Sequence, residues 1–299
     1  MLRISDFLDY LRLEKNYSPR TVQSYGDDLS RFETYFTSID STLSWVTVDG
    51  DIIRDWMESM MDKGNNAATI NRRLSALRSF FRYALAYGLT EHDPAHGIIG
   101  PKKSKPLPKF VREDDMERLL DDGMWDDSFS DARARTIIIV FYETGLRVSE
   151  LVGLDDDMID MSAMQLKVTG KGNKQRIVPF GDGLKHTLEQ YISKRNDSVP
   201  RLSAALFVSD RGERMTIGSV QYLVKRHLSR VTRQAKRSPH VLRHTFATAM
   251  LNHEAGIESV KKLLGHAKLS TTEIYTHTTF EQLKRQYKTA HPRATTQNQ

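Results

Sequence analysis

A segment rich in proline, glycine and lysine divides this chain of 299 residues into two parts. It covers residues 92–114 and reads HDPAHGIIGPKKSKPLPKFVRED, a composition that makes a helix improbable. The chain is also longer than an average domain, which favours two domains. We therefore predict a first domain over residues 1–98, an extended basic linker over 99–112 and a second domain over 113–299.

The residues before this linker have the apolar periodicity of helices. In SPRTVQSYGDDLSRFETYF, Ser18 is suited to cap a helix and Pro19 to occupy its first position. Apolar residues then recur every three or four positions. The stretch NNAATINRRLSALRSFFRYALAYG predicts a second strong helix that closes near Gly88. We expect a compact, all-helical first domain.

From about residue 113 the pattern is mixed. DARARTIIIVFYETG predicts a buried helix that ends at Gly145, and LRVSELVGL predicts a second, short one. MQLKVTGKGNKQRIVPF alternates on either side of a GKGNK turn and predicts a β-hairpin, and LFVSDRGERMT predicts a smaller hairpin. After Thr216 we expect helix nearly to the end. The predicted fold class is mainly α, with a small antiparallel β-sheet in a mostly helical second domain.

Charge and composition narrow the range of partners. The formal net charge is +6, yet residues 1–100 hold 11 Lys and Arg against 14 Asp and Glu, so the excess of basic residues lies further along the chain. This distribution indicates an anionic partner, most commonly nucleic acid. The absence of cysteine excludes disulfides, thiolate nucleophiles and cysteine-based zinc sites. The sequence contains no apolar run long enough to predict a membrane span, and its charged start is unlike a secretory signal. We therefore expect a cytoplasmic protein.

Two familiar kinds of site fit poorly. His240 and His244 are four residues apart, but HVLRH lacks the glutamate of a metalloprotease helix and no third ligand is nearby. TGKGNK lacks the spacing of a phosphate-binding Walker loop. We therefore predict no metal site.

Arginine is a better guide to chemistry here. Arg147 follows the helix end at Gly145, and Arg243 lies in the helix HVLRHTFATAM, three residues after His240. Arginine binds phosphate through two parallel N–H bonds and keeps its charge when partly buried. Taken singly, each arginine is more simply explained by a structural partner such as Glu150. Lys171, at the hairpin tip, is either a solvated residue or a proton donor on an arm.

The stretch LLGHAKLSTTEIYTH, residues 263–277, contains a helix end and a helix start. The helix is predicted to end at Gly265, with its apolar face formed by Ile257, Val260, Leu263 and Leu264. STTE has the form of a capping box, in which Ser270 caps the next helix and Glu273 bonds back to it. Tyr275 then lies in the first turns of that helix, either as an ordinary half-buried aromatic or as a presented functional group.

Four blocks, in this order and spacing, closely resemble the tyrosine recombinases, particularly the Xer type: ETGLRVSEL, GKGNKQRIVP, HVLRHTFAT and LLGHAKLSTTEIYTH. SPRTVQSY and NRRLSALRSFFRYA resemble the N-terminal, core-binding domain of that family. The resemblance covers nearly the whole chain. It implies that an N-terminal DNA-clamping domain and a C-terminal catalytic domain form a C-shaped clamp round duplex DNA.

The resemblance also implies the roles of individual residues. The six active-site positions of the family fall on Arg147, Lys171, His240, Arg243, His266 and Tyr275. Tyr275 is then the nucleophile, and Glu150 resembles a supporting acidic position. The chemistry that the resemblance implies needs no metal, cofactor or ATP. We expect further DNA contacts from the basic residues Arg72, Arg73, Arg78, Lys102, Lys103 and Lys105.

The implied partners are double-stranded DNA carrying a specific site, and other recombinase subunits. We expect a homo- or heterotetramer on DNA, with or without a related recombinase and a host activator. The C-terminal helix FEQLKRQYKTAHP is expected to dock onto a neighbouring subunit. Xer-like resolution of chromosome or plasmid dimers is the preferred role. The alternatives are an integrase of a phage or transposable element and, from another class, a non-catalytic architectural DNA-binding protein. A type IB topoisomerase fits the N-terminal blocks less well.

Overall fold

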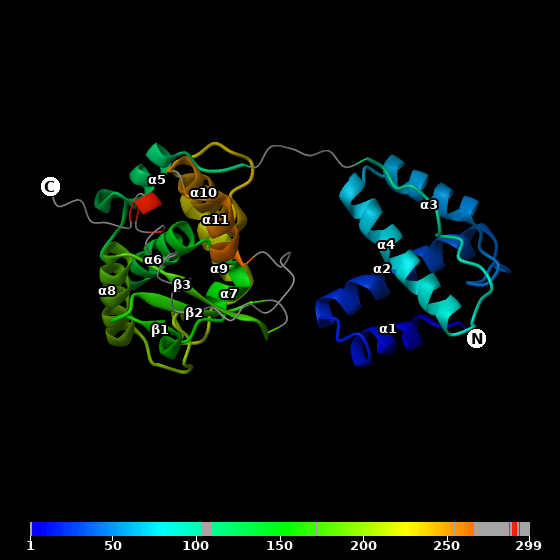
Figure 1. Cartoon of the computed structure of the whole chain (residues 1–299), viewed down its shortest axis with the longest axis horizontal. Helices are drawn as coiled ribbons and strands as arrows, with labels where there is room; N and C mark the ends of the chain where they lie inside the picture. Colours follow the sequence, from blue (N-terminus) through cyan, green and yellow to red (C-terminus); the bar gives the residue numbers. More distant parts are fainter. Residues whose placement is uncertain are drawn as a thin grey trace. The chain divides into compact units, whose positions relative to one another are not determined.

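The computed structural model describes residues 2–102, 109–170, 173–253, 255–265, 287, 289–291 and 293 (Figure 1). The chain divides into two compact units, Met1–Pro106 and Leu107–Gln299. The division falls within the segment 99–112 that the composition singles out. The mainly helical fold class predicted from the sequence is confirmed in both units.

The first unit contains four helices in its described residues: α1 (Ile4–Leu13), α2 (Pro19–Ile39), α3 (Gly50–Asp62) and α4 (Ala67–Ala86). The Ser18 hydroxyl accepts a hydrogen bond from the backbone N–H of Thr21 at 3.3 Å, as expected of an N-cap. The side chain of Asn66 caps α4 in the same way, through the N–H of Thr69 at 2.9 Å. Both predicted helices are therefore confirmed, while α1 and α3 have no individual counterpart among our sequence predictions.

Aromatic side chains hold these four helices together. Phe7, Phe32 and Phe80 are fully buried, and the indole of Trp45 lies with its ring centroid 4.5 Å from that of Phe80. Edge-to-face and tilted ring pairs of this kind add to the stabilisation from burial alone. The unit thus has a hydrophobic core of its own.

The second unit contains several helices round a central one, together with a small sheet. Its first elements are α5 (Glu113–Leu120), η1 (Asp122–Met124), α6 (Phe129–Thr144), α7 (Val148–Val152) and η2 (Asp156–Met158). The strands follow as β1 (Ile159–Asp160), β2 (Gln165–Thr169) and β3 (Gln175–Pro179). The remaining helices are α8 (Asp182–Ser198), α9 (Ile217–Leu228), α10 (Pro239–Asn252) and α11 (Ile257–Leu264). None of the described helices, in either unit, is long and apolar enough to span a membrane.

The three strands form one antiparallel sheet in the order β1-β2-β3. Lys167 pairs with Ile177 across the predicted hairpin, which is confirmed up to the turn. Successive side chains of a strand point to opposite faces, so Arg176 and Val178 of β3 both face inward. The smaller predicted hairpin has one bridge, between Val208 and Arg214. Backbone hydrogen bonds from Met215 N–H to the Phe207 carbonyl and from Ser209 N–H to the Glu213 carbonyl, at 3.1 and 2.7 Å, lie on either side of it.

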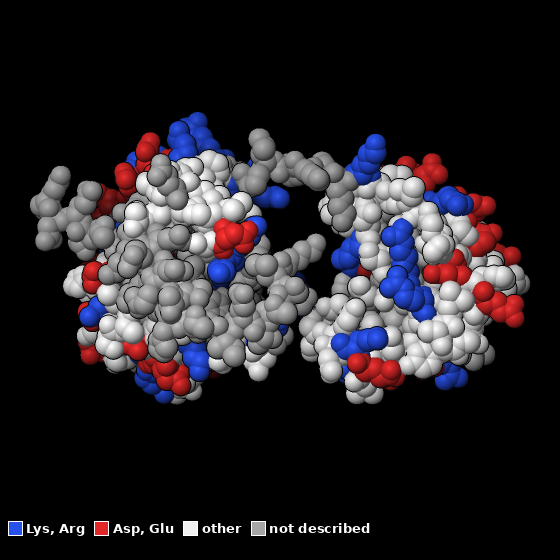
Figure 2. Space-filling model, in the orientation of Figure 1, with Lys and Arg blue, Asp and Glu red and all other residues white. Residues whose placement is uncertain are grey.

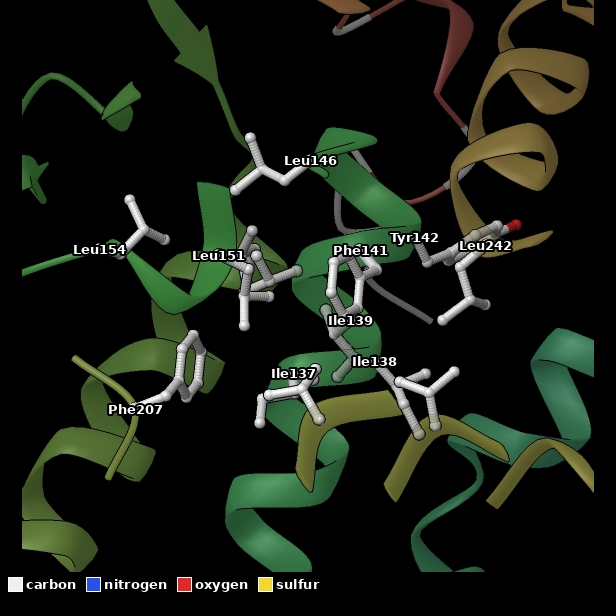
Figure 3. Close-up of a cluster of buried hydrophobic side chains, with 14 of the residues drawn as sticks. Ile137, Ile138, Ile139, Phe141, Tyr142, Leu146, Leu151, Leu154, Phe207 and Leu242 are labelled. Atoms are coloured by element: carbon white, nitrogen blue, oxygen red, sulfur yellow. The ribbon is translucent and has the colours of Figure 1, made fainter. Parts of the chain in front are cut away.

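Helix α6 is the centre of the second unit. Its residues 133–144 are buried almost throughout, because α8, α9 and α10 all pack against it. Figure 3 shows Ile137, Ile138 and Ile139 of α6 beside Leu151 and Phe207 from the surrounding segments. A helix enclosed on all sides cannot shift easily, since protein interiors are close-packed. The C-terminal end of α6, from which the chain continues to α7, is therefore held in a fixed position.

One expectation about the C-terminal region is wrong. Ile257 is 59% exposed, so only Val260, Leu263 and Leu264 of the predicted apolar face are buried. Ile257 is the first residue of α11, before that face meets α10. The docking of FEQLKRQYKTAHP on a neighbouring subunit stays a prediction. Among the described residues of this segment, Tyr287 is buried within this chain.

The described residues at the end of this segment pack against aromatic rings of the same unit. His291 stacks on Phe246 of α10, with ring centroids 5.7 Å apart, and its Nε2 lies 3.1 Å from the carbonyl oxygen of Tyr142. The carboxylate of Glu143 accepts a hydrogen bond from the Tyr287 hydroxyl at 3.4 Å. The described part of this segment therefore finds its partners in cis.

Candidate active site

Helix α6 ends at a glycine that no other residue replaces easily. Gly145 has a φ of +61°, in the left-handed region. A Cβ added there would lie 2.5 Å from Cδ1 of Phe246 and 2.8 Å from Cδ2 of Leu264. The missing side chain lets α10 and α11 approach the end of α6. The next two residues place Arg147 at the start of α7.

A buried carboxylate organises the start of α7. Glu150 is 3% exposed and accepts a hydrogen bond from the backbone N–H of Arg147 at 2.8 Å and another from its Nη1 at 2.8 Å. Arg176 of β3 donates from Nη1 and Nη2 to the two oxygens of the same carboxylate, at 2.8 and 2.9 Å. One carboxylate thus holds two arginines from distant segments.

Glu150 keeps its charge in this setting. Burial acts to raise its pKa, but the hydrogen bonds and charge of Arg176, followed by those of Arg147, outweigh burial and lower the pKa to about 2. The carboxylate is therefore ionised at neutral pH. An ionised carboxylate gives the strongest hydrogen bonds to guanidinium groups.

Three arginines converge on the C-terminal end of α11. Arg176 Nε donates to the carbonyl oxygen of Leu263 at 3.0 Å. Arg243 Nη2 donates to that of Leu264 at 2.6 Å, and Arg147 Nη2 donates to that of Gly265 at 3.2 Å. The last carbonyls of a helix lack intrahelical partners and carry the negative end of its dipole. Three consecutive peptide groups therefore each receive one guanidinium.

Arg243 is more deeply buried than Arg147, the other predicted phosphate-binding arginine. It is 8% exposed, and its Nη1 donates to the carbonyl oxygen of Gly145 at 2.6 Å. Burial, and after it the charge of Arg147, lowers its pKa to about 10, so it remains protonated at neutral pH. Arg147, with 35% of its side chain exposed, is the one that is open to a ligand.

The cluster has an excess of positive charge. Arg147, Arg176 and Arg243 are accompanied by one carboxylate, that of Glu150, among the described residues. Two guanidinium charges are left without a compensating anion in this cluster. Because the guanidinium groups are fixed by backbone carbonyls, the arrangement is suited to a phosphate group.

His240 lies one turn before Arg243 on α10 and is exposed. No described residue forms a hydrogen bond with its ring. Lys171, His266 and Tyr275 lie outside the described residues, as do Ser270 and Glu273 of the predicted capping box. The structure therefore brings together Arg147, Glu150 and Arg243 and places His240 nearby on α10.

The residues that precede two of these positions are described, and both border the cluster. A Cβ added to Gly170 would lie 3.4 Å from Oε1 of Glu150, and one added to Gly265 would lie 3.1 Å from Cδ of Arg176. The chain thus reaches Lys171 and His266 from points beside the Glu150–Arg176 pair.

The predicted DNA-contacting arginines of α4 differ in their surroundings. Arg72 is exposed, and it pairs with the buried carboxylate of Asp28 and donates to the hydroxyl of Ser24. The side chain of Arg73 is 11% exposed and also faces Asp28, while Arg78 donates to the backbone carbonyl of Ile98. Figure 2 shows Lys and Arg side chains gathered on the visible face of this unit.

Of the linker lysines that we expected to contact DNA, Lys102 is exposed, and Lys103 and Lys105 lie outside the described residues. Among the residues that are described, no three or more His, Asp or Glu side chains are grouped to hold a metal ion.

Arg176 was missed in the sequence analysis, although a signal for it exists. The alternation of β3 places Arg176 on the same face as Val178, which is the buried face. An arginine at an inward position of a strand needs an anionic partner. That pattern would have pointed to a buried ion pair.

Two family models match the chain. The phage integrase family matches residues 109–282, and the N-terminal SAM-like domain of phage integrases matches residues 4–88. Among curated relatives, tyrosine recombinase XerC of Pelotomaculum thermopropionicum is 38% identical over 98% of this chain and 99% of its own length. Tyrosine recombinase XerD of Oceanobacillus iheyensis is 37% identical over 97% of this chain and 98% of its own.

Solved structures share the fold. The XerH site-specific recombinase in a post-cleavage complex with a palindromic difH substrate superposes with a TM-score of 0.72 at 23% identity, covering 96% of this chain and 84% of that one. The Tn1549 transposon integrase, in complex with circular intermediate DNA, gives a TM-score of 0.69 at 19% identity and covers 94% of this chain and 99% of that one.

Proposed function

This chain belongs to the phage integrase family, and we infer that it is a tyrosine-type, site-specific DNA recombinase of the Xer kind. Its curated relatives are named XerC and XerD and match it along almost their whole length. Such an enzyme cuts one DNA strand at a time and rejoins it to another. Double-stranded DNA is accordingly its substrate.

The observation that carries the active-site proposal is the placement of Arg147 and Arg243 on adjacent carbonyls of α11. A DNA phosphodiester is anionic and resists attack, because charge builds up on its non-bridging oxygens in the transition state. Donors fixed in advance where charge develops are worth far more than mobile ones. We assign the two arginines, together with His266, to that role.

The covalent step follows from this assignment. The Tyr275 hydroxyl oxygen attacks the phosphorus, its proton passes to His240, and the bond between phosphorus and the 5′ oxygen breaks. Lys171 gives a proton to the leaving 5′ oxygen. The products are a 3′-phosphotyrosyl bond and a free 5′ hydroxyl. Because the phosphotyrosyl bond conserves the energy of the broken bond, religation needs no external energy source.

Religation to a second duplex produces a four-way junction and then recombinant DNA. We assign this reaction to a tetramer on DNA, formed by this chain alone or with a related recombinase, and subject to a host activator. The cytoplasm is the proposed location. Relatives of the Xer type at 36–38% identity favour resolution of chromosome or plasmid dimers. Integration of a mobile element is the second candidate and would use the same chemistry.

A trapping experiment tests this proposal. The full chain is used to select its binding site from random duplexes, and the recovered site is nicked beside the cleaved phosphate so that cleavage cannot reverse. The wild-type protein is expected to form a covalent protein–DNA adduct on a denaturing gel. Tyr275→Phe is expected to bind the same duplex with unchanged affinity and form none.

An adduct that survives Tyr275→Phe contradicts the choice of nucleophile. A wild-type protein that binds its selected duplex but gives no adduct supports an architectural DNA-binding protein instead.

A further inference from the structure

We propose that Arg176 is a positioning residue of the cleavage reaction, which fixes the segments that carry Arg147, Lys171 and His266 relative to one another. The inference rests on the proposed function, since it concerns the same site. Arg176 is not one of the residues proposed to touch DNA. It acts through three neighbours: Glu150, Leu263 and the hairpin base at Gly170.

Every polar group of Arg176 is engaged inside the protein. Its side chain is 7% exposed on the inward face of β3. Nη1 and Nη2 form a two-pronged bond to the carboxylate of Glu150, at 2.8 and 2.9 Å, and Nε donates to the carbonyl oxygen of Leu263 at 3.0 Å. A planar guanidinium fixes the direction of all three bonds at once, which an ammonium group cannot do.

The first connection controls Arg147. Because Arg176 occupies both oxygens of Glu150, Arg147 is left with a single side-chain bond to that carboxylate, from Nη1 to Oε1. Without Arg176, the carboxylate is free to form a two-pronged pair with Arg147 and draw it away from a phosphate. Arg176 thus keeps donors of Arg147 available to DNA.

The second connection controls the end of α11. The bond from Arg176 to Leu263 is the first of the three bonds to consecutive carbonyls, and a shift of α11 by one residue breaks all three together. Gly265 lies so close that an added Cβ would be 3.1 to 3.2 Å from Cδ, Nε and Nη1 of Arg176. Gly265, from which the chain continues to His266, is therefore held in contact with Arg176.

The third connection concerns the hairpin. The backbone N–H of Gly170 donates to the carbonyl oxygen of Lys174 at 2.8 Å and closes the base of the β2–β3 turn. An added Cβ on Gly170 would lie 3.4 Å from Oε1 of Glu150 and 3.8 Å from Nη1 of Arg176. The residue before Lys171 therefore rests on the ion pair, and the pair sets where the hairpin starts.

A second buried arginine offers a matched control. Arg195 of α8 is fully buried and forms the same two-pronged bond, at 2.8 and 2.9 Å, to the carboxylate of Asp156. Its Nη1 also donates to the carbonyl oxygen of Leu206 at 2.9 Å. The two-pronged bond is the same as that of Arg176, although the side chain of Asp156 is 33% exposed, and none of these partners belongs to the arginine cluster. A purely structural effect should therefore be the same for both.

The experiment compares Arg176→Gln, Arg176→Lys and Arg195→Gln on the selected, nicked duplex. For each folded variant we measure melting temperature, DNA affinity and the single-turnover rate of adduct formation. Both glutamine variants are expected to lose stability. Arg176→Gln should also slow adduct formation about 10²-fold at a DNA affinity within about threefold of wild type, since a displaced catalytic group costs about that much. Arg195→Gln should cleave at the wild-type rate.

The pH dependence of the rate of adduct formation provides a second measurement, which a purely structural role of Arg176 would leave unchanged. Glu150 is surrounded by Arg147 of α7, Arg176 of β3 and Arg243 of α10. With Arg176 removed, burial meets less opposition and the pKa of Glu150 rises. Protonation of Glu150 then frees Arg147 from the two-pronged pair, so the rate of Arg176→Gln relative to that of wild type should increase from pH 8 to pH 6. The double variant Glu150→Gln, Arg176→Gln should lose this extra dependence.

Arg176→Lys keeps the charge and covers the case in which the glutamine variant fails to fold. It should cleave at least about tenfold more slowly than wild type, because a lysine cannot form the two-pronged bond. Wild-type rates in Arg176→Lys, or equal losses in the Arg176 and Arg195 glutamine variants, overturn the inference. A wild-type protein that forms no adduct overturns the proposed function instead.

Discussion

Arg243 donates a hydrogen bond of 2.6 Å to the carbonyl oxygen of Leu264, two residues before His266. Its other terminal nitrogen donates to the carbonyl oxygen of Gly145, also at 2.6 Å. One side chain of α10 thereby joins the end of α6 to the end of α11. A proposed phosphate-binding arginine is therefore also the brace that holds the surrounding segments.

Arg243→Lys should separate the charge of this side chain from its bracing role. A single ammonium cannot bridge both carbonyls in the same geometry, and a buried carbonyl left without a partner costs about 1–3 kcal/mol. We expect unfolding free energy to fall by about that amount and adduct formation to slow about 10²- to 10³-fold, as for loss of one transition-state donor. Urea denaturation and single-turnover cleavage measure the two effects. A lysine variant with wild-type cleavage would show that charge alone suffices.

Gly145→Ala tests the close approach at the end of α6. Gly88 provides the control, because its φ of +64° is nearly the same but no atom lies within 4 Å of an added Cβ. Gly88→Ala should lower the free energy of unfolding by about 1–2 kcal/mol, because alanine is disfavoured in the left-handed backbone conformation. Gly145→Ala should cost about 1–3 kcal/mol more through overpacking against Phe246 and Leu264. Segment-resolved hydrogen exchange reads each unit separately, and equal costs would contradict the packing argument.

The C-terminal segment should respond to pH through two opposed groups. Burial raises the pKa of Glu143 to about 7, against the charge of Arg293, so its contribution to stability is present below pH 4.5 and is lost as pH rises through 7. Burial lowers the pKa of His291 to about 4, so its contribution is present above pH 6.5 and is lost as pH falls through 4. Each is worth up to about 3 kcal/mol.

Between pH 4.5 and 6.5 the two slopes should cancel in the wild-type protein. Glu143→Gln should leave stability that rises with pH in this window, and His291→Gln should leave stability that falls. The double variant should again be flat. Urea denaturation at a series of pH values measures this, and identical profiles for the two single variants would refute the assignment.

DNA binding should weaken steeply with salt. If six or more phosphates are neutralised, affinity should fall roughly 10³-fold or more from 50 to 200 mM salt. Arg72→Ala should reduce the slope of log affinity against log salt by about one, as for a single phosphate contact. Arg73, whose side chain is 11% exposed, is the comparison: its alanine variant should lose stability and keep the slope. A flat salt response would contradict binding along the DNA backbone.

Much of the fold could be predicted because its signals are local. The cap at Ser18, the left-handed glycines at Gly145 and Gly265, and the alternation of β2 and β3 each involve a few neighbouring residues. The arginine cluster could not be predicted in the same way. Arg147 meets Gly265 across 118 positions, and no spacing rule shows which carbonyl a distant arginine will find. The resemblance selected Arg147 and Arg243. The alternation of β3 could indicate an inward position for Arg176, but not that its partners are Glu150 and the carbonyl of Leu263.

The carbonyls that receive the three arginines are those of residues 263–265, late in the chain. During translation, the unit Met1–Pro106 is complete roughly 160 residues before these acceptors exist. At ~5–20 residues per second this interval lasts about 8 to 30 s. A nascent chain in that interval has the predicted DNA-clamping unit but not the assembled arginine cluster. Premature termination before residue 263 therefore yields a fragment without the carbonyls that position the three arginines, and such a fragment should form no covalent adduct with DNA.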